Sequence, residues 1–279
     1  MSYQNILNTV SAKKPIFDIQ YGILSAPVRH CFMIGTIWNL KKNNPNLKNI
    51  SILEIGSWLG ASALSFAQGL QDHNDSLGTV TCVDAWKPFF DEEKNSADVH
   101  KNMQAMLSSD IAYNIFLHNI GTLPSSILCQ HLKGQSDNIL PMLKAEQFDV
   151  IFIDADHTYE PVKKDILNSI PLLKDGGIIC GDDLNLQMFE CDSELATKSG
   201  DQDFIKDTKT GRNFHPGVTL AVDEIFGKVA AFGGFWAIQK KGDSWAIPSY
   251  KDMPIIYPNH FPEEALQKAK SHMSDITIF

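Results

Sequence analysis

The chain has 279 residues, of which 43% are hydrophobic and 20% are charged, and its formal net charge at pH 7 is −9. This composition is ordinary for a globular chain, and the length is ample for a buried core. The acidic balance argues against nucleic acid as the main partner, because no excess of basic residues is available to neutralise phosphates.

The five cysteines, at positions 31, 82, 129, 180 and 191, are odd in number and widely spaced. No Cys-x-x-Cys pair occurs, so no zinc site of that kind is indicated, and a reducing, intracellular compartment fits best. The first 30 residues carry charges and no sustained apolar run, and no segment is apolar for long enough to span a membrane. We therefore expect a cytoplasmic protein without a membrane partner.

The hydrophobic pattern alternates between strand-like and helix-like segments, which is typical of an α/β sheet. We expect strands near 51–56, 79–84, 127–133, 148–154, 176–182, 229–233 and 234–240. We expect helices near 26–42, 60–71, 96–108, 137–145, 158–173 and 217–227, with a late kink at Pro171. Residues 1–48 are then an N-terminal helical extension and residues 246–279 a C-terminal extension.

The first chemical signal is a strand that runs into a glycine-containing turn, Ser51-Ile-Leu-Glu-Ile-Gly-Ser-Trp-Leu-Gly60. Gly56 permits a sharp turn close to a ligand, and Gly60 opens a helix whose free N–H groups favour a polar or anionic ligand group. A dinucleotide-binding turn reads Gly-x-Gly-x-x-Gly, but here Glu54 replaces the first glycine and the last interval is one residue longer. The Glu54 carboxylate suits a ligand with an amine or a sulfonium, and Ser57 lies in the same turn. An ordinary strand-turn-helix is the alternative.

The next two strands end in polar residues. The second closes with Asp84, followed by Trp86, and a carboxylate at this position grips a ribose diol in folds of this kind. Trp86 would add an apolar face beside it. After the third strand, Ser136 opens a short helix and is equally suited to be its N-cap.

Acidic residues follow the fourth and fifth strands. One apolar run stops at Asp154, with His157 just beyond, and the next stops at Asp182 and Asp183. The carboxyl ends of neighbouring parallel strands meet at one edge of the sheet, where open α/β sheets bind ligands. The unpaired like charges would repel each other, so a cation is expected there; His157, lysine side chains or helix dipoles are the alternative source of positive charge.

The segment 185–216 is polar and is the least regular part of the pattern. A loop of this length is usually functional or disordered, so we interpret it as a lid or an acceptor-binding insertion, with a disordered excursion as the alternative. His215 lies at its end.

These motifs resemble those of the class I S-adenosylmethionine-dependent methyltransferases. They are closest to the small-molecule O-methyltransferase branch, which includes catechol O-methyltransferase-like enzymes and bacterial sugar O-methyltransferases. The matching pieces lie between about residues 50 and 240 and are Leu53-Glu-Ile-Gly-Ser-Trp-Leu-Gly60, Val83-Asp-Ala-Trp86, Gly134-Gln-Ser136, Ile153-Asp-Ala-Asp-His-Thr-Tyr159 and Gly176-Gly-Ile-Ile-Cys-Gly-Asp-Asp183.

The resemblance implies a Rossmann-like, doubly wound α/β fold with a mostly parallel seven-stranded sheet and helices on both faces. The methyltransferase domain would cover residues 49–245 and contain the insertion. S-adenosylmethionine would lie against Glu54, Gly56, Ser57, Gly60, Asp84, Trp86, Ser136 and Asp154.

The implied activity is O-methylation of a small molecule or sugar, by a protein that is expected to form a homo-oligomer. A divalent ion such as Mg²⁺ would orient the acceptor hydroxyl and lower its pKa. Asp154, Asp182 and Asp183 would hold it, although catechol O-methyltransferase-like enzymes carry Asn at the third position. His157, His215 and Asp154 are the candidate catalytic residues. Two alternatives are a non-catalytic interaction protein on the same fold, against which the full set of acids argues, and a nicotinamide-dependent oxidoreductase, whose glycine pattern is broken here.

Overall fold

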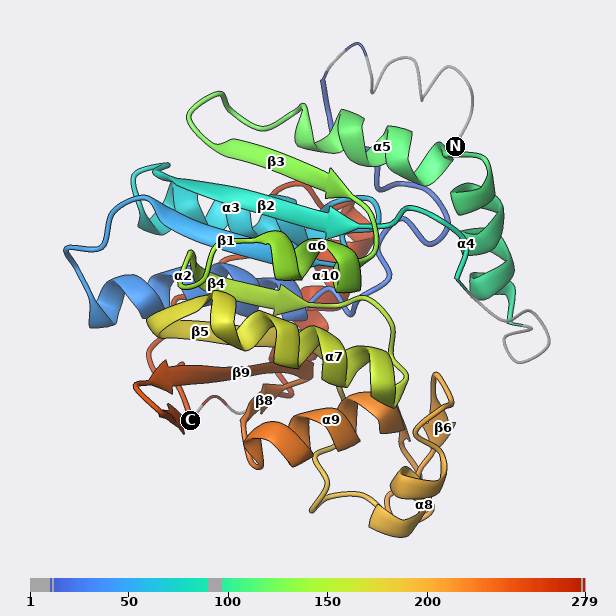
Figure 1. Cartoon of the computed structure of the whole chain (residues 1–279). Coiled ribbons are helices and arrows are strands. Elements are labelled where there is room, and N and C mark those ends of the chain that lie inside the picture. Colours follow the sequence, from blue (N-terminus) through green and yellow to red (C-terminus); the bar gives the residue numbers. More distant parts are fainter. Residues whose placement is uncertain (1–10, 12, 90–96, 277, 279) are drawn as a thin grey trace.

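A computed structural model describes residue 11 and residues 13–89, 97–276 and 278 of the chain (Figure 1). Within this part of the chain, the centre of the fold is an eight-stranded sheet in which the path of neighbours is β10-β9-β5-β4-β1-β2-β3, and β8 also pairs with β9. The parallel strands are β1 (Ile50–Ile55), β2 (Gly78–Asp84), β3 (Leu128–Lys133), β4 (Phe148–Ile153) and β5 (Leu173–Leu184). The antiparallel strands are β8 (Ala230–Phe232), β9 (Gly234–Lys241) and β10 (Ser244–Ala246).

This sheet confirms the predicted fold class. All seven expected strands form, and the short β10 was not predicted. Strand order reverses between β1 and β4, so the chain crosses to opposite sides of β1 and leaves a crevice at the carboxyl ends of these strands. The residues with predicted chemistry follow these ends.

Helices cover both faces of the sheet. On one face lie α2 (Arg29–Asn43), α3 (Ala61–His73), α5 (Ile111–Ile120) and α10 (Glu263–Met273); on the other lie α6 (Ser136–Ile139), α7 (Tyr159–Ser169) and α9 (Pro216–Phe226) (Figure 1). Helix α4 (Asp98–Ser108) lies beyond the carboxyl end of β2 (Figure 1). Among the helices described, none is long and apolar enough to cross a membrane.

Alternation along each central strand separates the core into two layers. Ile52 and Val150 pack with the α2–α3 layer, whereas their neighbours Leu53 and Ile151 pack with the α7–α9 layer. Successive strand residues point to opposite faces, so continuous apolar runs are required where helices cover both. This explains why the strands could be located from the sequence.

The helices differ from the prediction where prolines intervene. The helix expected at 137–145 is only α6 followed by a 3₁₀ turn, Leu140–Met142, which contains Pro141. The helix expected at 158–173 ends as α7 at Ser169, and a second 3₁₀ turn, Ile170–Leu172, contains Pro171. Proline lacks the N–H that an α-helix needs. Helices α5 and α10 were not predicted.

The two predicted extensions pack into the main core. In α2, consecutive residues from Cys31 to Ile34 are all fully buried, so the helix is enclosed on every side. Tyr250 and Met253, beyond the predicted boundary at 245/246, belong to the same hydrophobic cluster as α2. The domain boundaries stay a prediction.

The insertion 185–216 has short elements of regular structure, which its polar sequence did not predict. It contains α8 (Ser193–Lys198) and a two-stranded sheet of β6 (Ile205–Lys206) and β7 (Asn213–Phe214). Its own apolar cluster consists of Leu186, Cys191, Ala196 and Phe214. In Figure 1 it lies on the side toward which the parallel strands point. Its movement as a lid stays a prediction.

Candidate active site at the strand ends

Glu54, near the end of β1, is a fully buried carboxylate. Neither of its oxygens makes a hydrogen bond of normal geometry in the described structure. Burial raises the pKa of this carboxyl to about 7, although the nearby side chains of Ser57, Ser62 and Cys82 oppose the shift. Buried carboxylates are normally paired, because the desolvation of an unpaired charge is costly. Such a carboxylate beside the glycine turn therefore fits a ligand that brings an ammonium group.

The glycines of the turn are required by backbone geometry. Gly56 has φ +86°, and a Cβ on this residue would collide with the carbonyl oxygen of Asp154 at the end of β4. Gly60, with φ +87°, is the N-cap of α3. Side chains are strained in this region of φ, so glycine lets the ends of β1 and β4 approach and leaves the first turn of α3 open.

Asp84 holds the glycine turn in place. Its Oδ2 accepts the backbone N–H groups of Ser57 and Trp58 at 2.9 and 3.0 Å, and its Oδ1 accepts that of Trp86 at 2.6 Å. Burial raises the pKa of Asp84, although these hydrogen bonds oppose the shift. A carboxylate can accept about four hydrogen bonds, so capacity for a ligand hydroxyl remains.

Two of the residues predicted to contact S-adenosylmethionine, Trp86 and Ser136, are held by packing or by a helix in this structure. The Trp86 ring is buried against Tyr113 and Phe116, and its Nε1 donates to the carbonyl of Trp58. Ser136 is the first residue of α6, whose N-cap is Gln135, so the N-cap role predicted for Ser136 is wrong. Both residues lie near the crevice, but the indole face of Trp86 is covered by protein.

The strand β5 is irregular at its acidic end. Its register against β9 shifts between Gly181 and Leu184, and Asp183 has φ +64°. In a regular strand, consecutive side chains point to opposite faces. The bulge and the left-handed residue instead turn Asp182 and Asp183 to the same site, as bulges near active sites often do.

Arg29, the first residue of α2, supplies the countercharge for both acids. Its Nη1 lies 2.6 Å from Asp182 Oδ1 and 2.6 Å from Asp183 Oδ1, and its Nε donates to the carbonyl of Gly233 at 2.7 Å. Arg29 is only 5% exposed. Burial lowers the pKa of this guanidinium, but the two carboxylates outweigh the effect and raise it, so Arg29 remains charged.

The two carboxyls respond differently to this environment. Burial raises the pKa of Asp182 well above its ordinary value, whereas Arg29, His215 and His157 outweigh burial and hold the pKa of Asp183 well below its usual range. Asp183 is therefore the ionised partner of Arg29, and Oδ2 of Asp182 remains buried without a protein hydrogen bond.

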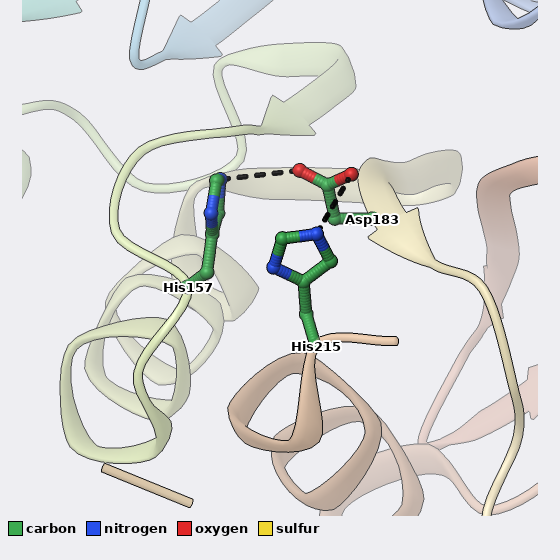
Figure 2. Close-up of side chains that lie close together, drawn as sticks. All are labelled: His157, Asp183 and His215. Carbon is green, nitrogen blue, oxygen red and sulfur yellow. Dashed lines mark ion pairs between the residues drawn. The ribbon is translucent and has the colours of Figure 1, made fainter. Parts of the chain in front are cut away.

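His157 and His215 meet at Asp183 (Figure 2). His157 follows β4 and places Nε2 3.1 Å from Asp183 Oδ2 and 3.8 Å from Asp154 Oδ1. His215, the N-cap of α9, places Nε2 3.5 Å from Asp183 Oδ1. The structure thus brings together Asp154, His157 and His215, the three predicted catalytic residues.

Asp203 of the insertion lies behind the two histidines. Its Oδ1 is 2.7 Å from His157 Nδ1 and 3.3 Å from His215 Nδ1, and its Oδ2 is 2.9 Å from Nε2 of His100 on α4. Burial lowers the pKa of His157, but the carboxylates of Asp183, Asp154 and Asp203 raise it well above its ordinary value. The insertion is therefore attached to the site by charge.

Sequence reasoning missed three members of this site, Arg29, Asp203 and His100. Arg29 carried a usable signal, because a charged residue at the start of an otherwise apolar helix needs a buried partner. Asp203 and His100 carried none, since polar residues in surface segments are common.

The predicted metal ligands fit a divalent ion. Asp154, Asp182 and Asp183 each offer a carboxylate oxygen, and these atoms lie within 4.8 Å of one another. The unpartnered Oδ2 of Asp182 is among the oxygens not held by Arg29. Oxygen donors of this kind suit Mg²⁺. Arg29 contacts only the Oδ1 atoms of Asp182 and Asp183, so the other carboxylate oxygens remain available to a metal ion.

Among the solved structures that this chain resembles are three O-methyltransferases. NovP is 17% identical over 77% of this chain and 80% of its own (TM-score 0.49). CalS11, a TDP-rhamnose 3′-O-methyltransferase of calicheamicin biosynthesis, is 14% identical over 87% of this chain and 88% of its own (TM-score 0.41). An O-methyltransferase from Bacillus cereus, solved with SAH, is 20% identical; 64% of each chain is covered, so this chain spans about two thirds of its length (TM-score 0.35).

A search of curated proteins gave no significant match. The family model described as a methyltransferase domain matches residues 53–184, which begin in β1 and end with β5. This range contains the buried Glu54, the glycine turn, Asp84 and the acids of β4 and β5. Residues 53–184, just under half of the chain, therefore match a methyltransferase domain.

Proposed function

We propose that this chain transfers the methyl group of S-adenosylmethionine to a hydroxyl oxygen of a small molecule, with sugar hydroxyls as the first class to test. The choice of methyl donor is supported by Glu54, which is buried beside the glycine turn and whose oxygens make no hydrogen bond of normal geometry. A donor with an ammonium group would pair with this carboxylate. The observation that favours an oxygen acceptor is the set of carboxylates and imidazoles at the adjacent strand ends.

Donor binding in this proposal uses the turn between β1 and α3. Glu54 takes the ammonium, Asp84 accepts the ribose hydroxyls, and Gly56, Ser57 and Gly60 allow the donor to lie close to the backbone. Asp84 already holds the backbone N–H groups of the turn, so ribose binding and the shape of the turn depend on the same carboxylate. Ser136 and the backbone of Trp86 lie at the adenine end.

Asp154, Asp182 and Asp183 are proposed to hold a divalent ion such as Mg²⁺. Such an ion orients the acceptor hydroxyl and lowers its pKa. Arg29 binds the Oδ1 atoms of Asp182 and Asp183 and so keeps both carboxylates in one orientation. Groups held in this way by an outer partner present their remaining oxygens in a fixed geometry.

His157 is proposed as the base that accepts the hydroxyl proton. The hydrogen bond of its Nδ1 to Asp203 fixes the ring and leaves Nε2 facing the site, the arrangement of a histidine oriented by a carboxylate. Nearby carboxylates raise the pKa of His157 well above its ordinary value and so favour its protonated form in the ligand-free chain. A cationic sulfonium donor offsets part of that negative charge. His215 and Asp154 are the next candidates.

A methyl-transfer screen with labelled S-adenosylmethionine against sugars, glycosides and catechols tests the proposal. We expect transfer to a hydroxyl, loss of turnover in EDTA and recovery with Mg²⁺ or Mn²⁺. His157→Gln should lower kcat by about 10²–10⁴-fold, the usual contribution of a general base. His272→Gln, on the exposed side of α10, is the matched control. Turnover that persists in EDTA would remove the metal role, and failure to bind the donor would refute the proposal.

A further inference from the structure

The two imidazoles at Asp183 form a second set of possible metal donors beside the carboxylates. Nε2 of His157 and Nε2 of His215 lie 3.1 and 3.5 Å from the two oxygens of Asp183, and the ring centroids are 4.7 Å apart at 75° (Figure 2). The three side chains come from the loop after β4, the bulge of β5 and the N-cap of α9. One ligand atom from each lies within 4.8 Å of the others.

The opposite nitrogens of both rings face one further carboxylate. Nδ1 of His157 donates to Asp203 Oδ1 at 2.7 Å, and Nδ1 of His215 lies 3.3 Å from the same oxygen. The hydrogen bond to Asp203 holds the His157 ring with Nδ1 as the donor and Nε2 toward Asp183, and the 3.3 Å approach of His215 Nδ1 to the same oxygen leaves its Nε2 facing Asp183 as well.

Each Nε2 atom that faces the Asp183 carboxylate needs either a proton or a metal ion between it and the carboxylate oxygen. Protons on both Nε2 atoms supply one solution, but the result is two imidazolium rings 4.7 Å apart, which repel each other in a largely buried site. A single divalent ion supplies the other solution and leaves both rings neutral. Metal-bound histidines usually have the outer carboxylate that Asp203 provides here.

We propose that His157, His215 and Asp183 form a binding site for a divalent first-row transition-metal ion such as Zn²⁺ or Co²⁺. Imidazole nitrogen favours these ions, whereas Mg²⁺ prefers oxygen. The site is distinct from the set of three carboxylates, although Asp183 belongs to both. Oδ1 of Asp183 is held by Arg29, so Oδ2 is the oxygen offered to the ion. His157 is 28% exposed and His215 16%, which leaves an entry path.

The proposed ion joins three parts of the chain. It links the ends of β4 and β5 to the N-terminus of α9, and through Asp203 it also fixes the insertion 185–216. An Nε2 atom bound to a metal ion cannot accept a proton. If His157 is the base of the proposed methyl transfer, Zn²⁺ at this site inhibits turnover, while Mg²⁺ on the carboxylates supports it.

Titration of the full chain with Co²⁺, followed by visible absorption, tests the site without donor or acceptor. We expect a nitrogen-containing Co²⁺ spectrum that Zn²⁺ removes by competition and excess Mg²⁺ does not. His157→Gln and His215→Gln should each weaken Co²⁺ binding about tenfold or more, since each removes a direct ligand. His272→Gln on α10 is the control and should bind as the wild type does.

The same titration distinguishes the other arrangements. If Co²⁺ binding is lost in Asp182→Asn but kept in both histidine variants, the ion lies in the carboxylate set and the proposal is wrong. If the wild type binds no Co²⁺, the rings carry protons instead and the proposal is equally wrong. Circular dichroism of each variant confirms folding, and the two histidine variants serve as independent tests if one is unstable. Because the readout needs no methyl donor, failure here is separable from failure of the proposed enzyme activity.

Discussion

Replacement of Arg29 by methionine tests whether this residue compensates the acidic cluster. The substitution keeps much of the side-chain volume but removes the guanidinium that contacts Asp182 and Asp183 at 2.6 Å and the Gly233 carbonyl at 2.7 Å. Removal of one partner from a buried ion pair costs about 3–5 kcal/mol, because the other charge stays buried and unpaired. At about 2–4 °C per kcal/mol, the melting temperature should fall by roughly 6–20 °C.

Urea denaturation monitored by circular dichroism at pH 7 measures this loss. The matched control is Lys174→Met, which breaks the 2.8 Å pair with Asp149; Lys174 is 37% exposed, so this pair is worth about 1 kcal/mol or less. Asp183→Asn in the Arg29→Met background should recover much of the stability, since Asp183 is the ionised partner. Excess Mg²⁺ should stabilise Arg29→Met more than the wild type, because a dication replaces the lost charge.

The reasoning fails if Arg29→Met and Lys174→Met lose similar amounts of stability. A double-mutant cycle between Arg29 and Asp183 with coupling below about 0.5 kcal/mol leads to the same conclusion, because coupled neighbours give about 0.5–3 kcal/mol.

Three further predictions concern the donor site and the insertion. Asp84→Ala should lower S-adenosylmethionine affinity at least about tenfold in isothermal titration, because charge-assisted hydrogen bonds are worth about 1.5–3 kcal/mol each; unchanged affinity in a folded variant contradicts the ribose role. Burial raises the pKa of Glu54 from 4.5 to about 7, so the folded chain binds the proton more tightly and wild-type stability falls as pH rises through this window. Glu54→Gln should therefore be more stable than the wild type above pH 7 by up to about 3 kcal/mol, with no difference near pH 4.5 in urea titrations; a pH-independent difference would contradict the burial argument. Asp203→Asn should speed tryptic cleavage within 185–216, since the insertion loses its charged attachment to the histidines; equal rates would show that other contacts hold it.

The sheet could be predicted because its signals are local. Each central strand is a short apolar run bounded by turn residues, and polar residues lie at or just beyond the ends of β1, β2, β4 and β5. Alignment of these ends in a parallel sheet follows from topology alone, so the proximity of Asp154, Asp182 and Asp183 could be predicted without coordinates.

The electrostatic environment of the acids could not be predicted, because their partners are distant in sequence. Arg29 lies 153 residues before Asp182, and His100 lies 103 residues before Asp203. The argument that three unpaired carboxylates need a metal was therefore incomplete: Arg29 supplies positive charge, and no local pattern reveals its contact with these acids. The bulge that turns Asp182 and Asp183 to one side was equally hidden, since it depends on pairing with β9.

The contact between Arg29 and the end of β5 also affects the order in which the protein folds. The parallel strands can pair through successive crossovers, but the countercharge for Asp182 and Asp183 arrives only when α2, which precedes all of these strands, has docked. An intermediate with a formed sheet and an undocked α2 therefore carries adjacent acids without their partner. Dissolved ions screen such repulsion, so the docking step should depend on ionic strength, while earlier strand pairing should not.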